Sequence, residues 1–385
     1  MKEDFVLLNT IYTMNHKENL FAAFPAISKK EWLEKVEKDL KGKALAELNW
    51  HLNEEITLPP FYHSEDLDQK YFPIRGNQLD NQWEIGEQIL VVTDLKKANT
   101  QALNALMNGV EALHFVLDQF ISKADLSLLL KGIEVDYIST HFHVKNDDNG
   151  MLSLLENFHQ LAIDHKKDTS NLKGSVQAEN NAQNWKVIQK SIAFAETNLP
   201  MFSVLTIQDK TDGLLITEGL AKMMSDANET IKALMDLGLS ASQASAKIQF
   251  SIQLSCSYFV EIARIRALKL LWANLLKAYK VTPSVPVIAA QFRMDSQTDN
   301  PHHNMIRATT QAMSAVLGGV DRLTVLPANE SFETATDFTR RIARNVQHLL
   351  KMESHLDRVA DPAAGSYYIE KLTTKFGSEA WKLIV

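Results

Sequence analysis

From about residue 85 onward, short runs of strand-forming residues alternate with longer segments whose apolar residues recur at helical spacing. About eight strand–helix units follow one another over roughly 270 residues, which is the order and size of a (β/α)8 TIM barrel. The pattern therefore predicts an α/β fold with a closed parallel barrel. The expected strands are Ile89–Thr93, Leu113–Leu117, Val135–Phe142, Gly174–Gln177, Met201–Ile207, Lys247–Gln253, Val285–Phe292 and Arg322–Pro327.

An open, doubly wound sheet is the alternative fold for the same alternation. It is less favoured because no glycine-rich phosphate-binding turn follows any of the early strands. The number of units is also already that of a closed barrel.

Segments at both ends of the chain extend the predicted barrel. Residues 1–84 form an N-terminal helical and extended arm for subunit contacts, residues 85–355 the barrel, and residues 356–385 a short C-terminal helical segment. In the arm, Ser28 is placed to cap an amphipathic helix within residues 24–43. The last residues, Trp381–Val385, are still apolar and helical in pattern, so we expect the chain to be truncated at this end.

A helix is also predicted from about Thr336 to Met352. Its apolar residues recur at helical spacing, and this face is expected to cover the sheet. The face comprises Phe338, Ile342, Val346 and Leu349.

The composition limits the kinds of binding partner and the cellular location that can be expected for this protein. The formal net charge of −7, without a dense Lys/Arg cluster, argues against nucleic acid as a partner. The single cysteine excludes an internal disulfide and a sulfur-rich metal site. No export signal is recognisable, and no window reaches the roughly 20 apolar residues that span a bilayer. We therefore expect a cytoplasmic protein with no membrane partner.

Two pairs of histidines are candidates for a metal site. His141 and His143 end the third expected strand and should point to one face at the barrel mouth, but too few ligands accompany them for a metal site. His302 and His303 are adjacent, which does not favour convergent ligation, and Pro301 or Asn304 could initiate the helix that follows. We therefore expect no bound metal.

For the other reactive side chains, a structural or surface role is expected and not a catalytic one. Cys256 has no nearby histidine to activate it and is expected to be a buried small residue at a helix start. The acidic residues Glu353, Asp357 and Asp361 are expected on the solvated surface. The segment DPAAGSYYIE, residues 361–370, is too particular for an ordinary loop, and belongs either to an active site or to a packed structural element.

Three stretches carry a family resemblance: SYFVEIARIRALKLLWANL (257–275), NMIRATTQAMSAVLGGVDRL (304–323) and DFTRRIARNVQHLLKMESHLDRVADPAAGSYYIEKLT (337–373). With residues 24–43 and Arg75–Gly76, the chain resembles the methylmalonyl-CoA mutases, which are adenosylcobalamin-dependent isomerases. The resemblance implies an N-terminal arm and a barrel through whose bore acyl-CoA threads. The family's C-terminal cobalamin domain, with its Asp-x-His-x-x-Gly segment, has no counterpart in this sequence.

The likeness breaks down at the family's catalytic positions. Alignment through Gly213 and Gly238 places Ile207 and Gln208 where the catalytic chains have a Tyr-His pair. The family's Thr-Gln-Ser-Leu-His-Thr-Asn segment corresponds to residues 320–326, without the Gln and His, and a Ser/Thr-rich loop between Arg293 and Pro301 is deleted. An apolar residue and an amide cannot replace a phenol and an imidazole.

These losses resemble the family's small, non-catalytic subunit, which pairs with a large subunit that holds adenosylcobalamin. The resemblance implies a heterodimer, a possible homodimer in isolation, no cofactor bound by this chain, and a structural role for DPAAGSYYIE. Arg266 and Lys269 are expected as vestigial CoA contacts. Two alternatives stay open: an acyl-CoA isomerase or hydrolase using His141, His143 and Asp321, and an acyl-CoA-binding module using Arg266 and Lys269.

Overall fold

The computed structural model describes residues 27–54, 56–66, 80–91, 94–145, 150–178, 184–209 and 215–384. The chain divides into two compact units, residues 1–67 and 68–385. Arg75, Gly76 and Gly213, which entered the family comparison, lie outside the described residues. Among the described helices, none combines the length and hydrophobicity that crossing a lipid bilayer requires.

The first unit contains the predicted arm helix. Helix α1 (Lys29–Asp39) begins at Ser28, whose side chain accepts a hydrogen bond from the Glu31 backbone, while the Glu31 carboxylate accepts from the Ser28 backbone. The indole of Trp32 packs edge-on against Phe61, with ring centroids 4.6 Å apart. Strands β1 (Trp50–His51) and β2 (Thr57–Leu58) pair antiparallel. The predicted capped helix is confirmed.

The second unit is a parallel sheet that closes on itself. Among the described residues the sheet has nine strands in the order β7-β6-β5-β4-β3-β11-β10-β9-β8, and every neighbouring pair is parallel. Their bounds are β3 Glu84–Val91, β4 Ala112–Leu117, β5 Ser139–Val144, β6 Lys173–Ala178, β7 Phe202–Ser203, β8 Leu205–Gln208, β9 Ile248–Leu254, β10 Val287–Phe292 and β11 Arg322–Thr324.

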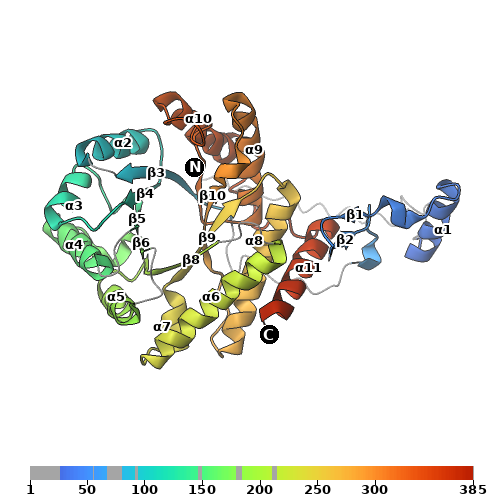
Figure 1. The fold of residues 1–385 in the computed structure, drawn as a ribbon, viewed down its shortest axis with the longest axis horizontal. Coiled ribbons are helices and arrows are strands. Elements are labelled where there is room, and N and C mark those ends of the chain that lie inside the picture. Colours follow the sequence, from blue (N-terminus) through green and yellow to red (C-terminus); the bar gives the residue numbers. More distant parts are fainter. Residues whose placement is uncertain are drawn as a thin grey trace, which may run out of the picture. The chain divides into compact units, whose positions relative to one another are not determined.

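A single bent run of chain joins the two edges of this sheet. Only Val204 separates β7 from β8; β7 pairs with β6 on one side, and β8 pairs with β9 on the other. The strands therefore form a ring with helices outside it, as Figure 1 shows. The predicted TIM barrel is confirmed, and each of the eight expected strands overlaps a strand of the sheet.

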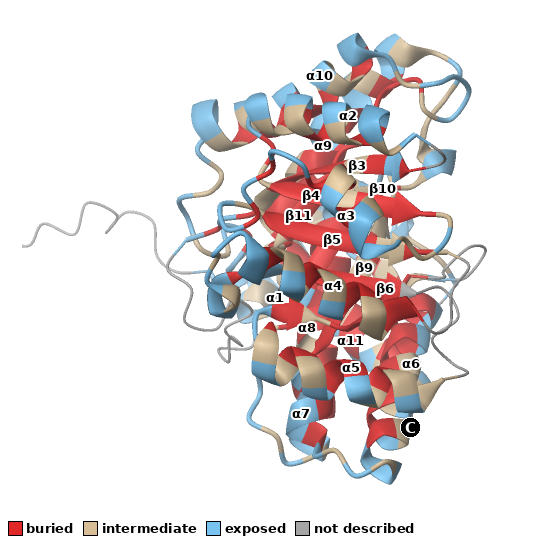
Figure 2. Cartoon of the chain, turned by 90° about the vertical axis from the view of Figure 1, so that its left-hand side faces the viewer, coloured by how far each residue is buried: buried red, intermediate tan, exposed pale blue. Residues whose placement is uncertain are grey.

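Helices cover the outside of the ring. They are α2 Leu95–Met107, α3 Lys123–Leu129, α4 Gly150–Asp164, α5 Trp185–Asn198, α6 Ile216–Asp236, α7 Ala241–Ala246, α8 Tyr258–Ala278, α9 Pro301–Gly318, α10 Asp337–His348 and α11 Tyr367–Ile384. Figure 2 shows buried strands, with exposed residues on the outer sides of the helices. Outward-facing strand residues such as Ile89, Phe115 and Phe250 are fully buried beneath these helices.

Helix α8 is buried on almost all sides because the barrel has a second outer layer there. It packs against α6, α9 and α11, and fifteen of its residues are buried. The C-terminal segment thus supplies α11, which lies against α8 and α6. Close packing of α9 on α8 needs Gly318, because a Cβ at that position would lie 2.8 Å from Ile265 Cδ1.

The orientation of α10 corrects part of the predicted face: Val346 is buried as expected, but Phe338 and Leu349 are not. The Phe338 side chain is 52% exposed and Leu349 is 57% exposed, whereas Ala343, Val346 and Gln347 are buried. The strand residue beneath this helix is a carboxylate, so α10 turns polar side chains inward: Arg344 Nη1 donates to Glu87 Oε2 at 2.6 Å. After His348 the helix continues as a π-helical turn, residues 349–353.

Candidate functional site

The barrel bore is lined by polar side chains. Glu87 reaches out to α10, so its neighbour Gln88 points into the ring, because successive strand residues face opposite sides. Following the strand register around the ring gives the other inward positions. They include Glu84, His114, Ser139, His141, His143, Ser175, Gln177, Gln208, Gln249, Ser251, Gln253, Gln291, Arg322 and Thr324.

This polarity distinguishes the bore from an ordinary barrel interior, which is packed with branched aliphatic residues. The apolar residues of the same strands, such as Phe142, Ile252 and Leu323, are buried between sheet and helices instead. A polar interior needs hydrogen-bond partners for each buried group. The bore is therefore the candidate functional site of the second unit.

One hydrogen-bonded cluster occupies the half of the bore nearer the N-terminal ends of the strands. Ser175 Oγ lies 2.8 Å from His141 Nδ1, and Ser139 Oγ lies 3.1 Å from His141 Nε2. Ser139 Oγ also donates to Glu84 Oε2 at 2.6 Å. Arg322 Nη1 approaches the same imidazole, 2.6 Å from Nε2. Both imidazole nitrogens are thus engaged by neighbouring side chains.

The Arg322–His141 contact crosses the interior of the ring. His141 is on β5 and Arg322 on β11, and strands β4 and β3 lie between these two in the sheet. Arg322 is 7% exposed and His141 is 4% exposed. Among the described residues, no carboxylate oxygen lies within 4.0 Å of the Arg322 guanidinium. The bore is therefore bridged by side chains at this level.

Burial disfavours the charged forms of the titratable groups in the bore. Burial, with a further contribution from Arg322, lowers the pKa of His114 to about 3 and holds the pKa of His141 well below its usual value. Burial also lowers the pKa of Arg322 to about 10, and raises the pKa of Glu84 against the opposing hydrogen bond from Ser139. At neutral pH the two imidazoles are uncharged.

An open cavity of about 660 Å³ leads to this cluster from the N-terminal ends of the strands. Its wall includes Trp83, Glu84, Tyr137, His141, Lys173 and Arg322. Lys351, from the π-helical turn, donates to the Trp83 backbone carbonyl at 2.9 Å and to Glu111 at 2.8 Å. Asp321 also lines this cavity, and its carboxylate accepts from the Ile288 backbone at 2.7 Å.

The two predicted histidines share one face of β5, as expected from their alternate spacing. The ring of His143 stacks on that of His114, with centroids 6.2 Å apart. His141, however, lies inside the bore and not at the mouth, because β5 begins at Ser139 and extends to Val144. In the part of the chain that the structure describes, no three His, Cys, Asp or Glu side chains are grouped to hold a metal ion.

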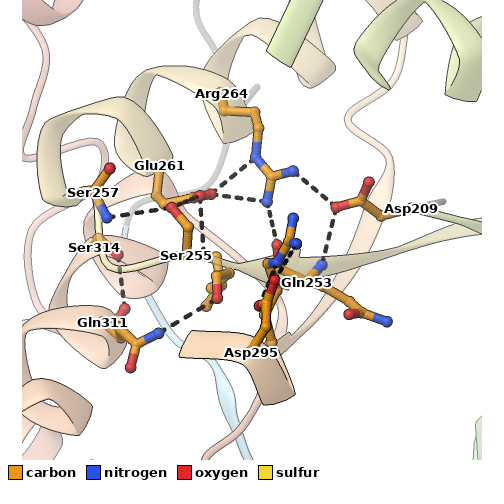
Figure 3. A network of polar contacts seen from close by, with 11 residues as sticks. Asp209, Gln253, Ser255, Ser257, Glu261, Arg264, Asp295, Gln311 and Ser314 are labelled. Atoms are coloured by element: carbon orange, nitrogen blue, oxygen red, sulfur yellow. Dashed lines mark hydrogen bonds and ion pairs between the residues drawn. The ribbon is translucent and has the colours of Figure 1, made fainter. Parts of the chain in front are cut away.

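A second polar network lies at the opposite, C-terminal ends of β8 and β9 (Figure 3). Arg264 of α8 donates to Asp209 Oδ2 at 2.8 Å, to Glu261 Oε2 at 2.9 Å and to the Gln253 carbonyl at 2.6 Å. Glu261 in turn accepts from Ser255, whose hydroxyl is 2.6 Å away. The network ties the start of α8 to the ends of two strands, so its charges are used to position backbone.

The two positions aligned with the family's Tyr-His pair lie on β8. Ile207 pairs in register with Phe250, and both are buried on the outer face of the sheet. Gln208 pairs with Ser251 and faces the bore. Neither side chain is titratable, so these two positions carry no proton-transfer group.

Arg266 and Lys269 lie on α8, outside the ring, where both are buried. Arg266 Nη2 donates to Glu370 Oε1 at 2.6 Å, and Nη1 donates to Asp361. The Lys269 ammonium donates to the Gly318 and Gly319 carbonyls at the end of α9. Their assignment as CoA contacts stays a prediction.

Two of the other residue predictions are wrong. Cys256 is exposed, because it lies in the turn before α8 begins at Tyr258 and not within the packed helix. Asp361 is half-buried because Arg266 draws it inward.

Pro301 occupies the first turn of α9, as predicted, and Asn300 caps the backbone of His302 and His303.

Sequence reasoning missed His114, Ser139, Ser175 and Arg322 as members of the bore cluster. A signal was available: polar residues alternate with apolar ones in strands expected to be buried on both faces, as in His141–Val144. Such alternation in a parallel barrel places polar groups in the interior.

Comparison with known proteins gives the following similarities. The sequence pattern of the methylmalonyl-CoA mutase family matches residues 119–385. The chain is 33% identical to the methylmalonyl-CoA mutase small subunit of Porphyromonas gingivalis, over 96% of this chain and 64% of that one. It is 28% identical to the small subunit of Streptomyces virginiae, over 94% and 64%.

Large subunits are similar over a shorter region. The methylmalonyl-CoA mutase large subunit of Porphyromonas gingivalis is 29% identical over 52% of this chain and 29% of that one. The chain spans less than two thirds of the length of the small subunits that it matches.

Proposed function

The chain belongs to the methylmalonyl-CoA mutase family, and from this premise we propose that it is the non-catalytic small subunit of a heterodimeric mutase that interconverts methylmalonyl-CoA and succinyl-CoA. In this proposal its role is to assemble with a catalytic large subunit and stabilise it. The arm at the N-terminus is the proposed region of subunit contact.

The observation that carries the proposal is the bridged bore. The family resemblance implies that a catalytic barrel threads acyl-CoA along its axis. In this chain the Arg322–His141 contact, 2.6 Å long, spans the axis between non-neighbouring strands. Ser139 and Glu84 make a second contact between non-neighbouring strands, at 2.6 Å. An extended thioester would have to break these buried contacts in order to pass.

The chemistry of the bore supports the same conclusion. The positions aligned with the catalytic Tyr-His pair hold Ile207 and Gln208, and the first of these faces away from the bore. His114 and His141 are uncharged at neutral pH and so have no proton to give as imidazolium. The bore residues therefore lack the groups that would steer a rearranging acyl group.

Adenosylcobalamin is proposed to be bound by the large subunit. A cobalt ligand must be an accessible imidazole, whereas His141 is buried between Ser139 and Ser175. The His141 imidazole therefore does not fit the cofactor. When bound in the partner, the cofactor supplies the radical chemistry; this chain would contribute subunit contacts only.

Relatives support a partner of this kind. Small and large subunits similar to this chain both occur in Porphyromonas gingivalis and in Streptomyces virginiae. A stable subunit pair of this size typically buries more than about 2,000 Å². A cytoplasmic location remains a prediction.

Co-expression with a candidate large-subunit gene tests the proposal. We expect a 1:1 complex by size-exclusion chromatography with light scattering, and isomerase activity only in samples that contain the large subunit. The large subunit alone should lose activity faster on incubation than the complex does. Failure of the two chains to co-purify would contradict the proposed role.

The alternative function is a barrel that itself binds or converts an acyl-CoA, and the cavity at the N-terminal ends of the strands is the observation in its favour. Titration of the isolated chain with methylmalonyl-CoA and succinyl-CoA in a calorimeter separates the two proposals. No heat at millimolar ligand favours the non-catalytic role. Micromolar binding that is lost on substitution of Arg322, but kept on substitution of Arg293, would favour the alternative.

A further inference from the structure

A chain of hydrogen bonds joins four side chains from three neighbouring strands inside the bore. Ser139 Oγ lies 2.6 Å from Glu84 Oε2 and 3.1 Å from His141 Nε2, and Ser175 Oγ lies 2.8 Å from His141 Nδ1. Glu84 is in the wall of the open cavity and its side chain is 32% exposed, whereas His141 and Ser175 are buried. The chain therefore connects a carboxylate at the cavity to the interior of the bore, whatever the subunit role of the protein.

The imidazole in the middle of this chain is neutral. Arg322 Nη1 lies 2.6 Å from His141 Nε2 and 2.7 Å from Nδ1, so the guanidinium approaches both ring nitrogens about equally and favours neither. A cation beside a buried ring opposes a second ring proton. A neutral imidazole has one N–H and one bare nitrogen, so one of two tautomers must be present.

The directions of the hydrogen bonds decide between the tautomers. An ionised carboxylate only accepts, so the single O–H of Ser139 is donated to Glu84. The Ser139 oxygen then faces His141 as an acceptor, and Nε2 must carry the ring proton. Nδ1 is bare and accepts from the Ser175 hydroxyl. The other tautomer would place the Nε2 lone pair against the Ser139 oxygen with no proton between them.

We propose that Glu84, acting through Ser139, fixes His141 as the tautomer protonated at Nε2, so that a carboxylate in the cavity controls which nitrogen of the buried imidazole is bare. A protonated Glu84 both donates and accepts, which frees the Ser139 hydroxyl to turn and removes the preference. The imidazole carries one proton in either state, and Glu84 holds the additional one. The bore thus contains a device that couples protonation in the cavity to the hydrogen bonding of His141.

Other charged or titratable side chains act on this chain only through space. Among the described residues none of them is hydrogen-bonded to Ser139, which is the link between Glu84 and His141. They are Glu111, His114, His143, Lys173, Asp321 and Arg322.

The first test is NMR spectroscopy of protein with ¹⁵N-labelled histidine at neutral pH, in which the ring nitrogen shifts distinguish a protonated from a bare nitrogen. The His141 signals are assigned by their loss in His141→Gln. In the wild type we expect Nε2 to be protonated. Ser139→Ala removes the acceptor of Nε2–H and leaves Ser175 to accept from Nδ1–H, so the tautomer should switch.

Ser175→Ala is the matched control, because it removes a second buried hydroxyl bonded to the same ring but leaves Ser139 and Glu84 in place. The wild-type tautomer should persist in this variant. A wild-type ring protonated at Nδ1 or at both nitrogens, or the same tautomer in both serine variants, would overturn the proposal.

The second test removes the charge of Glu84. The amide in Glu84→Gln both donates and accepts, so the two His141 nitrogen shifts should move toward each other as the tautomers mix. Asp136→Asn removes a carboxylate of the same cavity wall, with the same side-chain exposure of 32%, and should leave the shifts unchanged. A wild-type pattern in Glu84→Gln would contradict control by Glu84. If this variant does not fold, acid titration of the wild type replaces it, and shifts that stay constant as Glu84 takes up its proton have the same meaning.

Discussion

Arg266 Nη2 of helix α8 donates to Glu370 Oε1 of helix α11 at 2.6 Å, across 104 positions of sequence. The same guanidinium donates through Nη1 to Asp361, and the Gly365 backbone also donates to Glu370, at 3.1 Å. Both carboxylates belong to DPAAGSYYIE. This segment is therefore a packed structural element that locks the C-terminal helix onto the barrel, in accord with the structural role that the family resemblance implies.

Loss of this ion-pair cluster should destabilise the fold. Arg266→Met keeps the length of the side chain but leaves Asp361 and Glu370 without their cation in a largely buried site. We expect a loss of about 3 kcal/mol in the free energy of unfolding, measured by urea denaturation. Arg358→Met, which removes the same charge from an exposed position, should change it by less than about 0.5 kcal/mol. Equal effects of the two substitutions would contradict a structural role for Arg266.

Stability should fall on mild acidification because of the uncharged imidazoles inside the bore. The pKa of His114 is about 3 in the folded protein, whereas an unfolded histidine titrates near 6.5. Between these values the unfolded chain binds a proton that the folded protein does not, so stability present above pH 6.5 is lost as the pH falls toward 3. Each such histidine contributes up to about 1.4 kcal/mol per pH unit.

The urea midpoint between pH 7.5 and 5 measures this effect. His114→Gln should flatten the pH dependence, because the amide does not titrate. His302→Gln, at an exposed position, should leave the slope unchanged. An unaltered slope in His114→Gln would show that His114 is not buried in its neutral form.

Arg322 should depress the basicity of its neighbour across the bore. Its charge is the second cause, after burial, of the lowered pKa of His141. Arg322→Met removes the charge and retains most of the volume, so the pKa of His141 should rise, although burial keeps it below 6.5. NMR titration of the imidazole protons measures the pKa. Arg293→Met, on an exposed pair with Asp295, serves as the control; a rise of the His141 pKa in both variants would point to a general charge effect.

Two glycine-to-alanine substitutions should act in opposite directions. At Gly174 of β6 a Cβ would lie 2.0 Å from the Thr140 carbonyl oxygen of the neighbouring strand. The backbone cannot yield cheaply there, so Gly174→Ala should cost about 3 kcal/mol or more. At Gly377 of α11 a Cβ would meet only the Leu270 side chain, at 3.3 Å.

Gly377→Ala should therefore stabilise the protein by up to about 1 kcal/mol, because alanine favours the helix. Thermal unfolding followed by circular dichroism compares the two variants. A loss of stability in Gly377→Ala as large as that in Gly174→Ala would contradict this difference in packing.

Much of the local structure follows from the sequence. The eight strands, the helix capped by Ser28 and the start of α9 at Pro301 were all predictable, because periodicity and capping act within a few residues of chain. Predictions failed where the partner is distant. The predicted face of α10 was partly wrong, because Glu87, 257 positions from Arg344, draws that arginine inward.

The candidate site shows the same difference between features that local sequence predicts and contacts between distant residues. The spacing of His141 and His143 indicated a shared face, which the structure confirms. Nothing local indicated that Arg322, 181 positions away from His141, would meet it across the bore.

The sequence by itself determined that strands and helices alternate along this chain, because side-chain periodicity separates the buried faces from the exposed faces. Only the tertiary structure decided what the ring encloses. The closure of the sheet through Val204 and the strand register set which inward residues come together, and these are long-range geometric relations that no short segment encodes.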